Sequence, residues 1–258
     1  MMMSAYFAKV RPTYIENWSA ALSALSIAQV DIPLTMEEAR ALGLINKEFS
    51  KWFSNGSIEP IDGIIKRIDM ALSNYPEGAF VRLGSRSGKD SSYANNRGFR
   101  VTDGNAAIRM LTENSHRIAY DLRLALHHNY CPHIFVRRWL EIPAWSEFRC
   151  FMKSRRLVGV SQYDCKNLGP CPEIAKNAER IEAAIREFFE AVSARSHLDD
   201  VVFDVFIKVG EQTSNVPINV QLLELNPYFR KTDACLFQWG NDGDFDGSFR
   251  FIKSQQLF

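Results

Sequence analysis

Residues 222–227 have the sequence Leu222-Leu223-Glu224-Leu225-Asn226-Pro227, in which an acid and an amide lie two residues apart on a predicted strand. Side chains alternate between the two faces of a strand, so Glu224 and Asn226 share one face while Leu223 and Leu225 face the core. Carboxylate and amide oxygens suit Mg²⁺, which prefers hard oxygen ligands and often binds nucleotide phosphates as well. The alternative is a half-buried strand that ends in a turn at Asn-Pro.

A second carboxylate strengthens the metal interpretation. Asp204 is the one charged residue in residues 201–207, which otherwise form an apolar predicted strand. An ionised carboxylate inside a sheet is costly unless it is paired or bound to a metal. If the chain folds back across the polar segment 210–217, Asp204 lies beside Glu224, and the two repel each other unless a cation lies between them. We therefore expect a divalent metal at this point, with a carboxylate pair beside Lys or Arg as the alternative.

Basic and small residues gather in residues 82–90, which read Arg-Leu-Gly-Ser-Arg-Ser-Gly-Lys-Asp. The two glycines allow backbone amides to approach phosphate oxygens, the serines offer hydroxyl donors, and Arg82, Arg86 and Lys89 supply positive charge. The segment is not the P-loop motif, because Asp90 stands where that motif has Ser or Thr. It favours a phosphate-binding loop, and the alternative is an exposed basic turn.

A second basic segment ends a predicted apolar strand at Phe135-Val136-Arg137-Arg138-Trp139-Leu140-Glu141-Ile142-Pro143. The arginine pair beside Trp139 and Leu140 could combine a phosphate contact with an apolar slot for a purine. On the next predicted strand, Arg149 shares a face with Glu147. Each of these residues is also ordinary in a strand whose arginines reach solvent and whose Trp lies in the core.

Hydrophobic periodicity predicts mainly helices up to about Tyr75, with a capping box at Thr35-Met36-Glu37-Glu38 and a helix over residues 61–72. A strand over 79–83 and a helix over 115–127 follow. Apolar residues at spacings of three and four, including Ile174, Ala178, Ile181, Ile185, Phe188 and Val192, predict a long amphipathic helix over 172–195. Further strands are expected at 134–140, 147–152, 157–162, 201–209 and 218–225.

Composition is that of a soluble globular protein: 258 residues, 46% hydrophobic and 24% charged. Thirty-one basic and thirty acidic residues give a net charge of +1, so no general attraction to nucleic acid or an anionic membrane is expected. No apolar run approaches the roughly 20 residues of a membrane helix. Five cysteines without a C-x-x-C pair favour reduced thiols, and we expect a cytoplasmic monomer.

The order of these parts resembles the ATP-grasp fold, and several motifs are similar to those of the cell division cycle protein 123 family. The resemblance covers about Phe80 to Trp239. The matching motifs are Phe135-Val136-Arg137-Arg138-Trp139, Glu147-Phe148-Arg149-Cys150-Phe151, Val160-Ser161-Gln162, Phe203-Asp204-Val205 and Asn226-Pro227, followed by Thr232-Asp233 and Leu236-Phe237-Gln238-Trp239. The chain departs from the family at Gly88, where Pro is usual, at Tyr163, where Arg is usual, and at Glu224, where Asp is usual. No counterpart of the family's aromatic N-terminal motif precedes Ser50.

The resemblance implies an α+β fold in which two lobes hold ATP between antiparallel sheets. It implies a helical N-terminal region over residues 1–75, an N-terminal lobe over 76–135 and a C-terminal lobe with the metal site over 136–258. The implied cofactors are ATP and Mg²⁺. By resemblance, the residues that bind phosphate are Arg82, Ser87, Gly88, Lys89, Arg137 and Arg149; those beside adenine are Arg138, Trp139 and Leu140; and the metal ligands are Asp204, Glu224 and Asn226.

Eukaryotic members of this family assist assembly of translation initiation factor 2 by binding its gamma subunit. The resemblance therefore implies a Mg²⁺-dependent ATP-binding protein that acts on a protein partner as a binding or assembly factor. The alternative is an ATP-dependent carboxylate-amine ligase or phosphotransferase with a small-molecule acceptor, which Glu224 favours. The residues alone identify no catalytic group. A nucleic-acid partner is not expected, because phosphate binding at one small site explains the basic residues.

Overall fold

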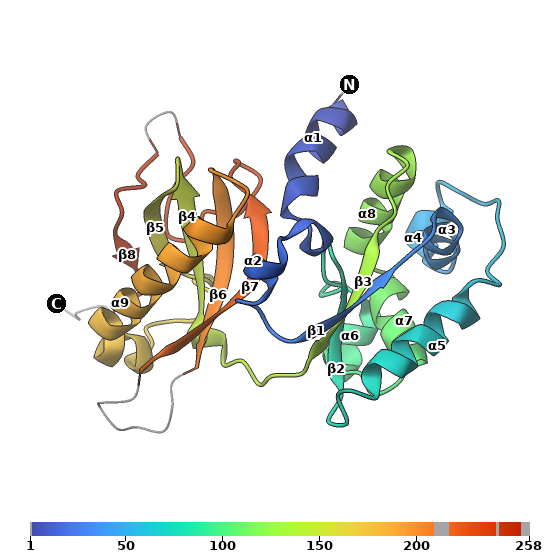
Figure 1. Cartoon of the computed structure of the whole chain (residues 1–258), viewed down its shortest axis with the longest axis horizontal. Helices are drawn as coiled ribbons and strands as arrows, with labels where there is room; N and C mark the ends of the chain where they lie inside the picture. Colours follow the sequence, from blue (N-terminus) through green and yellow to red (C-terminus); the bar gives the residue numbers. More distant parts are fainter. Residues whose placement is uncertain (1, 209–216, 241–242, 254–258) are drawn as a thin grey trace. The chain divides into compact units, whose positions relative to one another are not determined.

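A computed structural model describes residues 2–208, 217–240 and 243–253 of the chain (Figure 1). By their contacts the residues form two compact units, Met1–Glu16 with Ala28–Leu140 and Asn17–Ile27 with Glu141–Phe258. Each unit combines helices with a sheet of its own, so the α+β class is confirmed. The division into three parts at residues 75 and 135 stays a prediction.

The sheet of the first unit has the antiparallel order β1-β3-β2, formed by β1 (Gln29–Pro33), β2 (Ala79–Leu83) and β3 (His133–Arg138). Strands β2 and β3 lie where the sequence predicts them. Strand β1 corrects the expectation of an entirely helical region before residue 75. Its alternating pattern is only five residues long, and its partner β3 is distant in sequence, so tertiary pairing rather than local preference creates this strand.

The first unit contains most of the helices that the structure describes. They are α1 (Met2–Val10), α3 (Met36–Leu44), α4 (Lys47–Ser50), α5 (Ile61–Leu72), α6 (Ser92–Arg97), α7 (Gly104–Thr112) and α8 (His116–His127). At the start of α3, Thr35 Oγ1 accepts from the Glu38 amide at 3.1 Å and Glu38 Oε2 accepts from the Thr35 amide at 2.8 Å, so the capping box is confirmed. Ser115 caps α8 in the same way. Helices α6 and α7 fall in a stretch for which the sequence predicts no helix.

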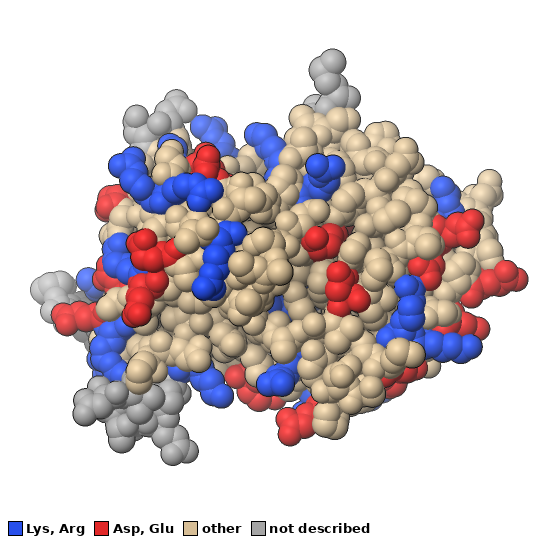
Figure 2. Space-filling model, in the orientation of Figure 1, with Lys and Arg blue, Asp and Glu red and all other residues tan. Residues whose placement is uncertain are grey.

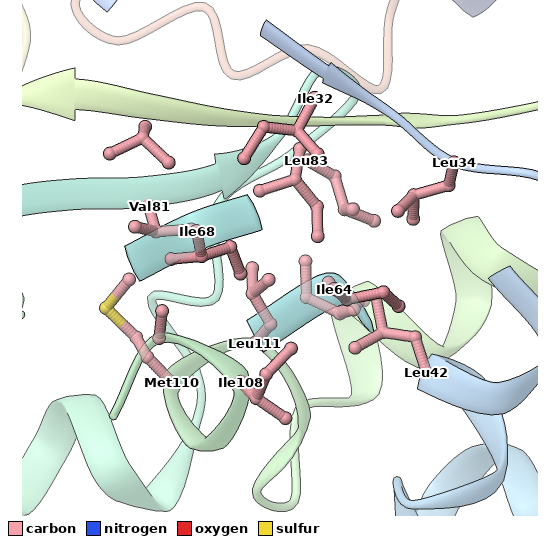
Figure 3. Close-up of a cluster of buried hydrophobic side chains, with 14 of the residues drawn as sticks. Ile32, Leu34, Leu42, Ile64, Ile68, Val81, Leu83, Ile108, Met110 and Leu111 are labelled. Carbon is pink, nitrogen blue, oxygen red and sulfur yellow. The ribbon is translucent and has the colours of Figure 1, made fainter. Parts of the chain in front are cut away.

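One face of the three-stranded sheet packs against α5 and α7 (Figure 3). Ile32 and Leu83 point from the strands toward Ile64 of α5, and all three are at most 4% exposed. Burying such a side chain stabilises the fold by about 1.5–3 kcal/mol. Because side chains alternate along a strand, the other face of the sheet carries Arg82 and Arg137.

The sheet of the second unit has the order β7-β6-β4-β5-β8, and its strands are β4 (Glu147–Lys153), β5 (Arg156–Gln162), β6 (Val201–Lys208), β7 (Asn219–Pro227) and β8 (Phe249–Arg250). The predicted hairpin β4–β5 turns at Ser154 and Arg155, whose φ angles of 49° and 57° are those of a tight two-residue turn. Strands β6 and β7 pair antiparallel, as predicted. Of their connection, residues 209–216 lie outside the described residues.

Helix α9 (Pro172–Arg195) has the predicted bounds and covers one face of this sheet (Figure 1). Its ring of Phe189 stacks on Phe203 of β6, with centroids 6.4 Å apart. The sequence places Phe188 on the apolar stripe, but Phe189 is the buried residue, because i+3 and i+4 positions lie almost equally close to the stripe. The face of the sheet turned away from α9 carries the charged residues.

The remaining short elements are α2 (Ala20–Ser23) and the 3₁₀ helices η1 (Arg11–Thr13), η2 (Ile15–Asn17) and η3 (Ala144–Ser146). Helix α2 belongs to the second unit, where the hydroxyl of Ser26 donates to the Leu222 carbonyl at 2.7 Å. None of the helices within the described residues has both the length and the apolar character that a membrane crossing requires.

Candidate functional site

The two carboxylates predicted to be neighbours are paired across β6 and β7. Asp204 lies directly opposite Glu224, and Asn226 lies opposite Val202, so Asp204, Glu224 and Asn226 project from the same face of the sheet. A bulge between Asp204 and Val205 shifts the register beyond this point. For this reason the second buried leucine of β7 is Leu222, rather than Leu223 as the alternation predicts.

Arg149 of β4 binds Asp204 from the other side. Its Nε donates to Oδ1 at 2.8 Å and its Nη2 to Oδ2 at 2.7 Å, a bidentate pair in which both side chains are at most 6% exposed. Burial lowers the pKa of Arg149, but the Asp204 carboxylate more than reverses this, so the pKa of the guanidinium lies above its ordinary value. The sequence left open a carboxylate pair that lies beside Lys or Arg, and Arg149 is such an arginine.

Asn226 completes the group on the sheet face. Its amide nitrogen lies 3.1 Å from Asp204 Oδ2 and 3.5 Å from Glu224 Oε1. Burial raises the pKa of Asp204, Arg149 acts in the opposite direction, and Glu224 raises the pKa further. The protein thus uses a guanidinium and an amide to stabilise two adjacent acids.

The donor set fits Mg²⁺. Two carboxylates and one amide supply hard oxygen atoms. Asp204 Oδ1 accepts from Arg149 and keeps a second lone pair, whereas Oδ2 accepts from both Arg149 and Asn226. A half-turn of the Asn226 amide would bring its oxygen to the same point. In the described part of the chain, no group of three or more His, Cys, Asp and Glu side chains is placed to hold a metal, so a metal bound here would take Asn226 as its third side-chain ligand.

Two further contacts of Arg149 come from residues outside its own strand, and the sequence did not predict them. The ring of Tyr163 lies 4.8 Å below the guanidinium, and Arg149 Nη1 donates to the Asp233 carbonyl at 3.0 Å. The Asp233 carboxylate accepts from Lys166 and from the Cys235 amide. The sequence motifs include Asp233, and they mark Tyr163 as a departure from the family, but only the fold shows that both contact Arg149.

Arg82 and Arg137 are diagonal neighbours on the first unit's sheet. Phe80 lies opposite Arg137 and Arg82 lies opposite Phe135, which places both arginines and both rings on the face away from α5 and α7. The arginines are 5% and 3% exposed. Ser87 forms an isolated bridge with Arg82, so this part of the predicted phosphate loop folds back along β2.

The rest of the loop is fixed by helices. Asp90 accepts from the Ser115 hydroxyl at 2.6 Å and from the Arg117 amide at 3.0 Å, which holds the loop to the start of α8. Arg86 pairs with buried Asp121 at 3.2 Å, which is a structural use of its charge. Lys89 is exposed, as a residue that binds a phosphate from solvent must be.

The remaining predicted residues follow β3. Arg138 is exposed, and its amide donates to the Ala28 carbonyl at 2.9 Å, while Trp139 and Leu140 are half-buried. Their predicted position beside adenine stays a prediction. The structure thus brings the predicted site residues together as two separate groups, one in each unit.

Charge on the molecule is otherwise mixed. Figure 2 shows Lys and Arg interspersed with Asp and Glu over the face drawn, in agreement with the net charge of +1. An extended basic surface of the kind that binds a nucleic acid backbone is not visible on that face.

The fold of this chain is that of Cdc123. The solved structure of Cdc123 from Schizosaccharomyces pombe matches it with a TM-score of 0.70 over 90% of each chain, at 21% identity. A C-terminally truncated form of the same protein gives a TM-score of 0.71. The D123 family model matches residues 48–256, so the chain belongs to the D123 family. The resemblance to the cell division cycle protein 123 family is confirmed.

Relatives of known name match shorter parts of the chain. A translation initiation factor eIF2 assembly protein of Xenopus tropicalis is 33% identical over 107 residues, which is 41% of this chain and 29% of that protein. The protein of the same name in Dictyostelium discoideum is 28% identical over 184 residues, or 68% of this chain and 44% of that protein. The chain therefore spans less than half the length of these relatives.

The buried pair gives a first prediction. Arg149→Met should lower the free energy of unfolding by about 3–5 kcal/mol, because it leaves Asp204 charged, buried and without its main partner. Arg149→Met combined with Asp204→Leu should recover most of this loss. Urea unfolding measures both, with Lys51→Met at the exposed Lys51–Glu48 pair as the control, which should change stability by less than about 0.5 kcal/mol. If Arg149→Met lowered the free energy of unfolding by no more than Lys51→Met, the buried pair would not have the stabilising role assigned to it.

A second prediction concerns Gly88. A Cβ atom at this position would lie 2.4 Å from the Met110 carbonyl oxygen of α7, so Gly88→Ala should destabilise the first unit by about 1–3 kcal/mol. Gly63→Ala on α5 is the matched control, since nothing lies within 4 Å of its Cβ position, and it should stabilise by up to about 1 kcal/mol. Thermal unfolding distinguishes the two variants. If Gly88→Ala left the stability unchanged, the loop would not pack closely against the Met110 carbonyl of α7.

Proposed function

We propose that this chain binds Mg²⁺–ATP and acts on a protein partner as an assembly factor. The observation that carries the proposal is the group of Asp204, Glu224 and Asn226 on neighbouring strands, with Arg149 beside it, in a member of the D123 family. The finer description of the fold as ATP-grasp belongs to the same proposal, as do the cytoplasmic location and the monomeric state.

Mg²⁺–ATP requires two kinds of protein group: cations for phosphate oxygens and hard oxygen ligands for the metal. In the first unit, the candidate cations are Arg82 and Arg137, diagonal on one sheet face, and Lys89, exposed on the adjoining loop. In the second unit, Asp204, Glu224 and Asn226 would hold the ion, which when bound would offset charge on the phosphates. Arg149 would orient Asp204, because both of its bonds to that carboxylate are short and buried.

The proposed partner is a protein, and the relatives named translation initiation factor eIF2 assembly proteins support translation initiation factor 2 as the first to test. If the chain is an assembly factor, we expect it to bind ATP without hydrolysing it rapidly. The second candidate is an ATP-dependent ligase or phosphotransferase, which the acid Glu224 opposite Asp204 favours. In that case an acceptor would stimulate ADP release, because positioned cations also stabilise a transferring phosphoryl group.

Removal of Glu224 tests the metal ligands. Glu224→Ala should weaken Mg²⁺-dependent ATP binding by at least about 100-fold, because even partners that only orient a ligand are worth 10–100-fold in metal affinity. Calorimetry with and without Mg²⁺ measures the effect, and far-UV circular dichroism checks that the fold is retained. Glu190→Ala, on the exposed side of α9, is the control and should bind as the unaltered protein does. Unchanged affinity in Glu224→Ala would exclude Glu224 as a ligand.

Removal of Lys89 tests the phosphate loop. Lys89→Ala should weaken ATP binding by about 10- to 100-fold, because a hydrogen bond from a charged group contributes about 1.5–3 kcal/mol. It should leave AMP binding almost unchanged. Lys66→Ala on the exposed side of α5 is the matched control. Competition binding with both nucleotides measures the ratio. Equal losses for ATP and AMP would count against a contact with a terminal phosphate.

A further inference from the structure

An indole ring is unusually exposed on the first unit. Trp52, just after α4, is 66% exposed, and Tyr120 on α8 is 40% exposed. The two belong to neighbouring elements, because α4 packs on α8. Large exposed aromatic side chains that lie close together mark interaction surfaces more often than isolated ones do.

Arg123 links Trp52 to the N-terminal helix. Its guanidinium lies 4.3 Å from the centroid of the Trp52 ring, and its Nη2 lies 4.0 Å from Met3 Sδ of α1. On the same helix as Arg123, Tyr120 packs edge-on against Tyr6 of α1, with centroids 6.2 Å apart. Met3, Tyr6, Trp52, Tyr120 and Arg123 therefore form one connected surface, here called the Trp52 patch.

Several exposed basic residues border the Trp52 patch. Exposed basic residues on α4 and α8 and just after α4 are Lys47, Lys51, His116 and Arg117. Three neighbouring carboxylates are already engaged. Glu48 pairs with Lys51 at 2.7 Å and lies 3.2 Å from the His116 ring, Asp90 accepts from the Ser115 hydroxyl and the Arg117 amide, and Asp121 is buried against Arg86. A partner that meets the Trp52 patch therefore finds cations whose charges the chain itself does not fully balance.

We infer that the Trp52 patch binds a protein segment that carries an apolar side chain flanked by acidic residues. Tryptophan, tyrosine, methionine and arginine are the residue types enriched at such contacts, and truncating a central one removes much of the affinity. A nucleic acid strand is the less favoured occupant, because Glu48 lies within the basic border and Arg123 already covers a face of Trp52 on which a base would stack. The inference does not depend on nucleotide binding.

Selection of peptides tests the chemistry of the occupant without a known partner. The probe is a phage-displayed library of random dodecapeptides, selected on the full chain and counter-selected on the Trp52→Ala variant. The expected result is enrichment of peptides with Leu, Ile, Phe or Trp next to Asp or Glu. Failure to enrich any peptide over the counter-selection, or enrichment of peptides without acidic residues, would overturn the inference.

A synthetic copy of the most enriched peptide then gives affinities by fluorescence anisotropy. Trp52→Ala should weaken binding by at least about tenfold, and Arg123→Gln should weaken it and reduce its dependence on salt. Met70→Ala and Ile58→Ala, at residues 74% and 58% exposed outside the Trp52 patch, are the matched controls and should bind normally. Circular dichroism confirms that each variant folds. Losses in the controls equal to those in the patch variants, or tighter binding of single-stranded oligonucleotide that Trp52→Ala abolishes, would also overturn the inference.

Discussion

The buried pair of Arg149 and Asp204 is the interaction on which the arrangement of the second unit depends. It joins β4 to β6 in the middle of the sheet, on the face away from α9, through two hydrogen bonds shorter than 3 Å. Two charges removed from water cost several kcal/mol each unless the geometry of their pairing is good and other bonds support it. Here Asn226, Tyr163 and the Asp233 carbonyl provide that support, so the candidate metal ligands and the buried pair form one network.

Patterns that depend on neighbouring residues were predicted well from the sequence. Helix α9, strand β2 and the capping box at Thr35 follow from periodicity and local hydrogen bonding, and the Asp204–Glu224 register follows from antiparallel pairing. What could not be predicted depends on contacts between distant residues. Strand β1 exists only because β3 pairs with it, and the bulge after Asp204 alone decides that Leu222 is buried. Likewise, the family resemblance implies Arg149 as a phosphate ligand, which stays a prediction, and only the fold shows that its guanidinium also binds Asp204.

The phosphate loop shows how structural and binding uses share a short segment. Arg82, Ser87 and Lys89 stay predicted phosphate ligands, while Arg86 and Asp90 bind Asp121 and the start of α8. The sequence alone does not separate these uses, since charge and spacing are the same for both. The Trp52 patch contrasts with this loop, because Trp52 is 66% exposed while its ring lies against the Arg123 guanidinium.

The charge count at the candidate metal ligands has a consequence for binding at that site. Asp204 and Glu224 bring two negative charges and Arg149 brings one positive charge, which leaves a single negative charge for a divalent ion. A divalent ion held by these residues would keep one net positive charge, which anionic phosphate oxygens would offset. On these electrostatics, a bound metal would favour phosphate and a bound phosphate would favour the metal, so the two affinities would be thermodynamically linked.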